Sequence, residues 1–125
     1  HPSEIQSTLN SIKDVKRVKK VVFQPHRYTR LKALWNEFLE NFNDIDELYV
    51  VDVFCAGDKF DETYNSENFV KEISKKGVRA HYVKGNMKQA GSFIAPQLKQ
   101  GDLLLTLGAG DITEIGGVIN DLLSK

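Results

Sequence analysis

Apolar positions along this chain alternate between the spacing of amphipathic helices and the short runs of buried strands. Residues 31–42 carry apolar side chains at i, i+3, i+4, i+7 and i+8 positions, which predicts an amphipathic helix. Residues 48–53 include the run Tyr-Val-Val and predict a strand buried on both faces. The other predicted elements are helices within 5–12, 66–77, 87–98 and 112–122, and strands at 18–23, 80–83 and 103–107.

This regular alternation of strands and helices defines the fold class. Strands joined by helices of about ten residues predict right-handed crossovers and a mostly parallel sheet. A chain of 125 residues can bury roughly two thirds of its unfolded surface, which is enough for its own core. We therefore predict an α/β fold, a three-layer Rossmann-like domain with a mostly parallel sheet, with residues 1–125 as a single domain.

Composition and charge narrow the class of protein. Seventeen basic and seventeen acidic residues cancel, which argues against a nucleic-acid partner and against binding to anionic membranes. Cys55 is the one cysteine, so an internal disulfide is excluded, and a single thiol fits the reducing cytoplasm. His1, His26 and His81 lack metal-ligand spacing, so we expect no metal site.

The most informative polar feature is the run FQPHRYTR at residues 23–30. It places His26, Arg27 and Arg30 between an apolar strand and the start of a helix. Ligands of open α/β sheets bind at the carboxyl ends of strands, and an arginine fork matches a carboxylate bidentately. Nothing about folding requires three potential cations here, so the run predicts a site for a carboxylate or a phosphate.

The start of the following helix bears on the same prediction. We expect Thr29 to cap this helix, with Arg30 in its first turn. A basic residue there is electrostatically unfavourable unless an anion binds, because helix amino termini carry a partial positive charge. The alternative is two solvated arginines with His26 stacked on Tyr28.

A glycine loop at residues 108–111 follows the last predicted strand. Gly108 and Gly110 permit close backbone approach to a ligand. A dinucleotide fingerprint would need a third glycine where Thr113 stands, so we reject a nicotinamide site. Asp111 is expected to cap the next helix, and a plain tight turn is the alternative to a ligand contact.

The longest predicted loop, residues 54–65, is rich in acidic residues. Asp52, Asp58 and Asp61 lie in or beside it and could hold Mg²⁺ or steer an amine. Solvated loop carboxylates are the alternative. No neighbouring histidine or asparagine activates Cys55, so we expect a small buried residue there rather than a nucleophile.

Four motifs together resemble the carboxy-terminal domain of the Mur ligases, and they span nearly the whole chain in family order. The FQPHRYTR run is specific to the branch of the family that adds L-alanine, whereas the glycine motif alone would be weak. The motifs are HPSEI at 1–5, FQPHRYTR at 23–30, AGD at 56–58 and GAGDI at 108–112.

This resemblance implies an ATP-dependent amide-bond ligase of peptidoglycan synthesis, located in the bacterial cytoplasm. In such enzymes ATP phosphorylates the carboxylate of UDP-N-acetylmuramate, and the amine of L-alanine attacks the acyl phosphate. The enzyme's own amino-terminal and central domains hold the UDP-sugar, the ATP and the Mg²⁺. The resemblance implies no cofactor intrinsic to the carboxy-terminal domain, which closes over the site and holds the amino acid.

The family's binding residues carry over to the arginine-rich run. The resemblance implies that His26, Arg27 and Arg30 grip the alanine carboxylate and the anionic intermediate. These groups position charge and do no covalent chemistry, so we expect no catalytic residue in this domain alone.

His1, Gly108 and Gly110 would line the same crevice, near nucleotide and substrate. The chain contains no G-x-x-x-x-G-K-[ST] motif, so we expect the domain alone to be inactive.

Two features depart from the family pattern. Cys55 stands where relatives often have proline or another small residue, and residues 59–65 lack a proline- and glycine-containing stretch that many relatives show.

Two other functions stay open. One alternative is a stand-alone α/β module that binds a small carboxylate or nucleotide. The other is a Mur-like recycling ligase for a different acceptor, against which the intact HRYTR sequence argues.

Overall fold

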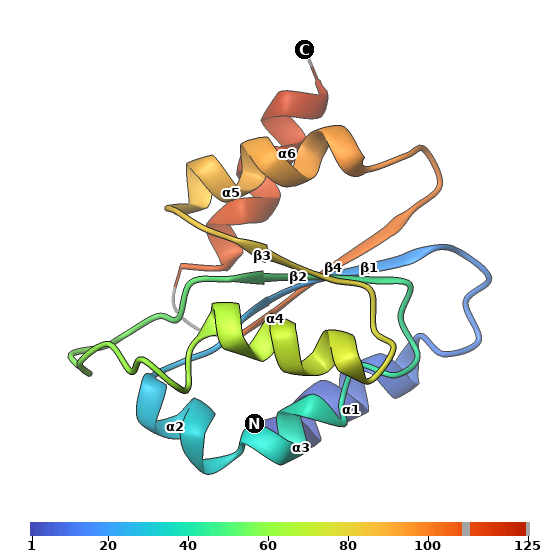
Figure 1. Ribbon diagram of the computed structural model, residues 1–125. Coiled ribbons are helices and arrows are strands. Elements are labelled where there is room, and N and C mark those ends of the chain that lie inside the picture. Colours follow the sequence, from blue (N-terminus) through green and yellow to red (C-terminus); the bar gives the residue numbers. More distant parts are fainter. Residues whose placement is uncertain (109–110, 125) are drawn as a thin grey trace.

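A four-stranded parallel sheet forms the middle layer of the computed structural model, which describes residues 1–108 and 111–124 (Figure 1). The strand order is β3-β2-β1-β4, so β1 and β2 are central. The parallel pairing of every neighbouring pair confirms the predicted fold class. The strands are β1 (Lys19–Gln24), β2 (Glu47–Val51), β3 (Ala80–Val83) and β4 (Leu103–Gly108).

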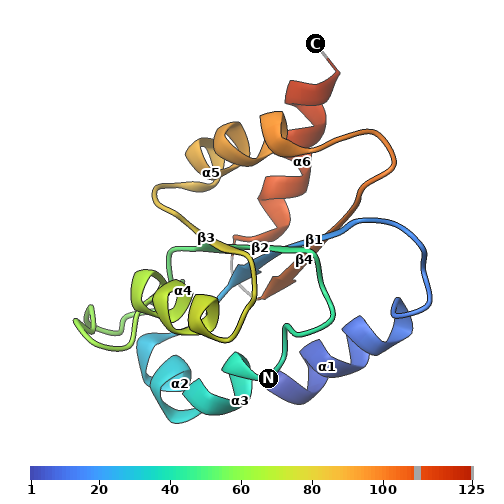
Figure 2. The ribbon, with the colours of Figure 1, turned by 45° about the vertical axis from the view of Figure 1, so that its right-hand side comes forward.

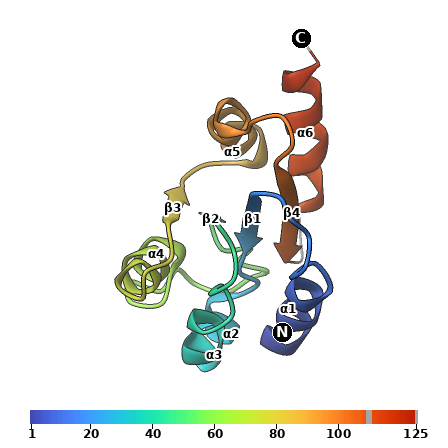
Figure 3. The ribbon, with the colours of Figure 1, turned by 90° about the vertical axis from the view of Figure 1, so that its right-hand side faces the viewer.

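Helices cover both faces of the sheet (Figure 3). On one face lie α1, α2, α3 and α4, and on the other lie α5 and α6. In the described parts of the chain, every helix is too short or too polar to span a lipid bilayer. The helices are α1 (Pro2–Ser11), α2 (Tyr28–Ala33), α3 (Trp35–Leu39), α4 (Ser66–Lys75), α5 (Met87–Ile94) and α6 (Thr113–Leu123), with a 3₁₀ turn, η1, at Ala95–Gln97.

The alternation of side chains along the central strands builds two separate cores. Successive residues of a strand point to opposite faces, so Val21 and Phe23 of β1 face α1–α4, and Val22 faces α5 and α6. Tyr49 and Val51 of β2 join Val22 in the second core. The near-continuous apolar runs of these strands follow from burial on both faces.

The first core is aromatic at its centre. The ring of Phe23 lies 5.4 Å from that of Phe38, 5.2 Å from Phe42 and 5.9 Å from Phe69, centroid to centroid. Tilted and edge-on contacts at such distances are the favoured arrangements of aromatic pairs. Phe23 thus fixes α3 and α4 against the strand that leads into the arginine-rich run.

Two predicted helices are shorter than their periodicity suggests. The helix predicted over 31–42 is divided into α2 and α3, because Leu34 leaves helical geometry at φ −116° and ψ 21°. Both short helices still turn the same apolar face inward, so the spacing of apolar residues does not reveal the break. The helix predicted over 87–98 ends at Ile94 and continues as the turn η1, which contains Pro96.

Candidate functional site

The carboxyl ends of β1 and β4 form the edge of the sheet at which the connections change sides. The helices after β1 and β2 cover one face, whereas α5, which joins β3 to β4, covers the other. Gln24 at the end of β1 is paired with Gly108 at the end of β4. Such a switch opens a crevice at the carboxyl edge of a parallel sheet, where ligands bind.

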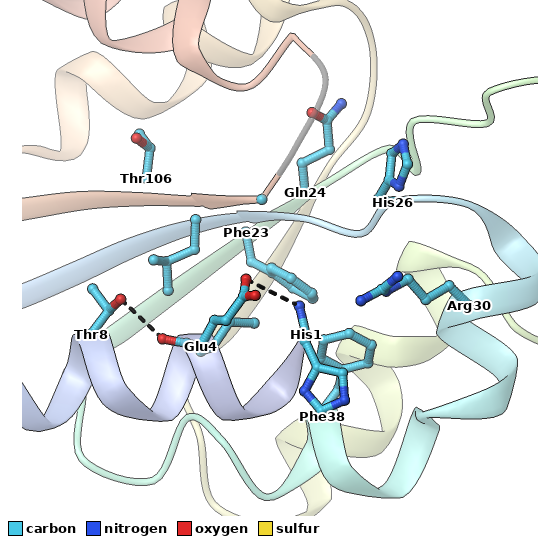
Figure 4. Close-up of a pocket in the computed structure, with 12 residues that line it drawn as sticks. His1, Glu4, Thr8, Phe23, Gln24, His26, Arg30, Phe38 and Thr106 are labelled. Atoms are coloured by element: carbon cyan, nitrogen blue, oxygen red, sulfur yellow. Dashed lines mark hydrogen bonds and ion pairs between the residues drawn. The ribbon is translucent and has the colours of Figure 1, made fainter.

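A pocket of about 410 Å³ opens at this edge, on the face covered by α1, α2 and α3 (Figure 4). The start of α1 lies beside α3 (Figure 2). Residues of α1 and of β4 both line the pocket, so elements from both ends of the chain contribute to it. The guanidinium of Arg30 points from α2 toward His1 and the ring of Phe23. The lining residues are His1, Glu4, Ile5, Thr8, Phe23, Gln24, His26, Arg30, Phe38, Thr106, Leu107 and Gly108.

Four of the residues singled out from the sequence line this pocket: His1, His26, Arg30 and Gly108. The His26 ring stacks on Phe54 at 5.6 Å, so the predicted stacking on Tyr28 is wrong, whereas Arg30, like Arg27, is exposed, as in the alternative of two solvated arginines. Within residues 1–108 and 111–124, neither the His26 ring nor the Arg30 guanidinium is in a hydrogen bond or an ion pair. An arginine fork without a protein partner can bind a carboxylate with two parallel hydrogen bonds.

Arg27 lies outside the pocket lining. Its backbone has a φ of 66°, in the left-handed region, and its N–H donates to the carbonyl of Phe54 at 2.8 Å. The Arg27 residue is exposed. The structure thus brings His26 and Arg30 together and leaves Arg27 on the adjoining surface.

The start of α2 differs from the prediction that Thr29 caps it. The helix begins at Tyr28 without a capping side chain of its own. Instead, the Oδ2 atom of Asp58 accepts hydrogen bonds from the backbone N–H of Thr29 at 3.2 Å and from its hydroxyl at 2.9 Å. These bonds, together with the charge of Arg27, hold the pKa of Asp58 below its ordinary value of 3.8.

The glycine loop enters the pocket through Gly108, while Gly110 lies outside the described residues. Gly108 has a φ of 136°, and a Cβ atom added there would lie less than 3.0 Å from the carbonyl oxygen of Gln24. Asp111 does not cap α6, whose N-cap residue is Ile112 without a side-chain bond. The Oδ1 atom of Asp111 accepts instead from the side-chain amide of Gln24 at 2.8 Å, so it links the turn before α6 to β1.

The acidic residues around the long loop bind groups of the protein. Asp52 accepts hydrogen bonds from the Tyr82 hydroxyl and from the backbone N–H of Gly85. Asp61 accepts from two backbone N–H groups within its own loop. Within residues 1–108 and 111–124, no group of three or more His, Cys, Asp or Glu residues could hold a metal ion.

Cys55 is exposed, so the prediction of a small buried residue is wrong. It stands at the start of a turn in which Asp58 N–H donates to the Cys55 carbonyl at 2.9 Å, and Ala56 adopts a φ of 49°. This turn carries Cys55 away from the core. His81 is half-buried, with its Nε2 atom 2.9 Å from a Glu47 carboxylate oxygen.

Outside the FQPHRYTR run, sequence reasoning gave no role to three polar residues of the pocket, Glu4, Thr8 and Thr106. Glu4 and Thr8 are four residues apart and so share one face of α1. Thr106 is the only polar residue in the apolar run of β4. A lone polar residue in such a run, and a polar pair at helical spacing, are the signals that could have indicated them.

A comparison with known families identifies the family of this chain. A family model described as "Mur ligase, glutamate ligase domain" matches residues 1–110. The chain belongs to the Mur ligase family. This Mur ligase domain is 40% identical to the UDP-N-acetylmuramate–L-alanine ligase of Clostridium beijerinckii over 93% of the chain and 25% of that relative. It is 38% identical to that of Koribacter versatilis over 99% of the chain and 27% of that relative.

The Mur ligase domain therefore spans about a quarter of the length of the curated relatives it matches. A solved structure supports the fold: a Haemophilus ducreyi domain described as part of a UDP-N-acetylmuramate:L-alanyl-gamma-D-glutamyl-diaminopimelate-type ligase. Its TM-score is 0.66 at 14% identity, over 98% of this chain and 84% of the other.

Proposed function

We propose that this Mur ligase domain belongs to a cytoplasmic, ATP-dependent ligase that joins L-alanine to UDP-N-acetylmuramate, and that the domain binds the incoming amino acid. The observation that carries this proposal is the pocket at the switch point, which His26 and Arg30 line without a hydrogen-bonded or ionic partner in the described residues. The proposal is also supported by the identity of the chain, at 35–42%, to ligases of that name.

The chemistry of these side chains suits the carboxylate of an amino acid. The Arg30 guanidinium offers parallel N–H donors to both carboxylate oxygens, and the His26 ring adds a donor beside it. Fixing the carboxylate orients the amine toward the reacting carbonyl, which lowers the entropic cost of the reaction. Arg27, in this proposal, acts on the same carboxylate from the surface beside the pocket.

ATP and Mg²⁺ belong, in this proposal, to the amino-terminal and central domains of the same protein. ATP supplies the activation of the acceptor carboxylate. In this proposal those other domains also hold the Mg²⁺, and no Mg²⁺ ligand is assigned to this domain. His1 and Gly108 line the crevice that closes against the nucleotide, and Gly110 is assigned to the same crevice. The isolated domain is accordingly expected to be inactive.

Replacement of Arg30 in the full-length ligase tests the proposal. We expect Arg30→Ala to raise the KM for L-alanine by at least about tenfold, equivalent to about 1.4 kcal/mol of lost binding. Arg79→Ala is the matched control, because Arg79 is exposed and lies before β3 at the opposite end of the sheet. An unchanged KM for alanine in Arg30→Ala would contradict the assigned role.

Calorimetry on the isolated domain separates this proposal from the stand-alone binding module. A site completed by closure of other domains should bind L-alanine at millimolar concentration or not at all. Micromolar binding of alanine or of another small carboxylate would favour the stand-alone module instead.

A further inference from the structure

Two segments that are far apart in the sequence are joined at the carboxyl edge of the sheet. The N–H of Arg27 donates to the Phe54 carbonyl at 2.8 Å, and the N–H of Phe54 donates to the Pro25 carbonyl at 2.9 Å. The rings of His26 and Phe54 stack with an angle of 16° between their planes. The segment that carries the candidate cations is therefore bound along its length to the start of the long loop.

The side chain of Asp58 completes this link. Its carboxylate binds both the N–H and the hydroxyl of Thr29, between Arg27 and Arg30 in the sequence. The turn that presents Asp58 is closed by its own N–H, which donates to the Cys55 carbonyl. Because the carboxylate already accepts from the Thr29 N–H, that N–H at the start of α2 is not free to bind a substrate.

The backbone on both sides of the link is strained. Arg27 and Ala56 are the two non-glycine residues with positive φ in the described residues, at 66° and 49°. Such conformations persist only where surrounding contacts hold them. Loss of the Asp58 contact would let the segment 26–30 relax toward ordinary backbone geometry and move the side chains of His26 and Arg30.

We propose that Asp58 is a positioning residue for amino-acid binding. Through Thr29 it holds residues 26–30 in the conformation in which His26 and Arg30 line the pocket before the substrate arrives. Preorganisation of this kind increases affinity, because binding no longer includes the cost of ordering the loop. This inference rests on the proposed function and adds to it a residue outside the pocket lining.

Asp61 provides a matched control in the same loop. Its Oδ1 atom accepts from the backbone N–H groups of Thr63 and Tyr64, each at 2.8 Å. The pKa of Asp61 is lowered by these bonds, as that of Asp58 is by its own. No hydrogen bond joins Asp61 to residues 26–30 in the part of the chain that the structure describes.

The test uses steady-state kinetics of the full-length ligase with L-alanine and ATP varied separately. We expect Asp58→Ala to raise the KM for alanine by at least about fivefold, with the KM for ATP unchanged. Thr29→Ala should act in the same direction, and Thr29→Ser, which keeps the hydroxyl, should behave as wild type. The double variant of Asp58→Ala and Thr29→Ala should be no worse than Asp58→Ala alone, since the hydrogen bond that Thr29→Ala removes is one of the two that Asp58→Ala removes.

The control variant Asp61→Ala should leave the KM for alanine unchanged, even if it lowers the melting temperature. An unchanged KM for alanine in Asp58→Ala, or an equal rise in Asp61→Ala, would overturn the inference. Fully additive effects of the two changes would overturn it too. If Asp58→Ala does not fold, the contrast between Thr29→Ala and Thr29→Ser decides the question.

The variant Arg30→Ala distinguishes a failure of the role of Asp58 from a failure of the proposed function. If the KM for alanine is raised in Arg30→Ala but unchanged in the Asp58 and Thr29 variants, Asp58 is not a positioning residue and the proposed function still holds. An unchanged KM in Arg30→Ala removes the proposed function itself.

Discussion

Gly108 lies where the end of β4 meets the end of β1, and the absence of a side chain there allows the two strands to approach. Its φ of 136° is one that residues with a Cβ atom rarely adopt. A Cβ atom would also lie less than 3.0 Å from the Gln24 carbonyl oxygen, a backbone atom that cannot rotate away. Gly108 therefore shapes the edge of the pocket through close backbone contact.

Gly108→Ala is expected to lower the free energy of unfolding by about 2 kcal/mol or more, since it combines backbone strain with a steric clash. Urea unfolding of the purified domain measures this loss. Gly116→Ala in α6 is the control: a Cβ atom there has no atom within 4 Å, so the change should stabilise by roughly 0.5–1 kcal/mol. Equal stability of the Gly108→Ala variant and wild type would contradict the argument.

The candidate cations show what a local sequence pattern can predict about the site and what it cannot. The pattern predicted that His26, Arg27 and Arg30 lie together after a strand, and the structure places two of them in one pocket. It did not predict Asp58 at the start of α2, because Thr29 and Asp58 are 29 residues apart. Only the path of the long loop brings that carboxylate to the helix, so the capping residue predicted from neighbours was wrong.

Among the helices, periodicity predicted the buried face well and the continuity poorly. Leu31, Phe38 and Phe42 are all buried as expected, although the backbone between α2 and α3 is interrupted at Leu34. The spacing of apolar residues reports which face of a helix is buried. A short break that keeps these residues on the buried face leaves the spacing unchanged, so the sequence does not reveal it. Packing of Trp35 edge-on against Phe69, at 5.3 Å, is a tertiary contact that the pattern does not reveal either.

The packing of α5 on α6 depends on a residue that has no side chain. A Cβ atom at Gly91 would lie 2.5 Å from the Cγ1 atom of Val118, inside any normal contact. Gly91→Ala is therefore expected to destabilise the domain by about 1–3 kcal/mol through overpacking. Adding Val118→Ala should restore part of this loss, and thermal unfolding of the single and double variants measures the coupling. Strict additivity would show that the loss in Gly91→Ala does not arise from contact with Val118.

For the molecule as a whole, alternation of strands and helices predicted a parallel sheet, but not the order of its strands. The order β3-β2-β1-β4 places α1 beside the arginine-rich run, so that Glu4 and Thr8 line the same pocket as Arg30. No spacing in the sequence predicts that α1 lies near Arg30, since this proximity depends on which face of the sheet each connecting helix covers. Fold class was therefore predictable, whereas the full set of pocket residues required the assembled sheet.

The amino edge of the sheet, opposite the pocket, carries a buried ion pair that links β1 to the start of β4. The Lys20 side chain is 5% exposed, and its Nζ atom lies 2.9 Å from Asp102 Oδ2 and 2.7 Å from the Gln97 carbonyl oxygen. The hydrogen bond from Lys20, then that from the Lys99 N–H, holds the pKa of Asp102 below its ordinary value of 3.8. The Glu47 carboxylate lies farther from Lys20 Nζ, at 4.0 Å, so removal of Asp102 leaves only this longer contact to compensate the buried lysine charge, which is costly.

This ion pair makes the stability of the domain depend on pH in a definite direction. A carboxyl group with a lowered pKa in the folded state stabilises the fold above its unfolded pKa, and this contribution is lost as the pH falls through the folded pKa. The free energy of unfolding should therefore decrease below about pH 4, where Asp102 binds a proton more readily in the unfolded chain. Urea unfolding at a series of pH values, followed by the fluorescence of Trp35, the single tryptophan, measures this decrease.

The variant Asp102→Asn isolates the contribution of this one carboxyl group. It should be less stable than wild type at pH 7, because Lys20 then loses its nearer charged partner and keeps only Glu47, 4.0 Å away. Its decrease below about pH 4 should be shallower, because an amide side chain does not titrate. Asp121→Asn, on the exposed side of α6, is the control and should reproduce the wild-type profile. Parallel profiles for Asp102→Asn and wild type would show that the pH dependence arises from other carboxyl groups.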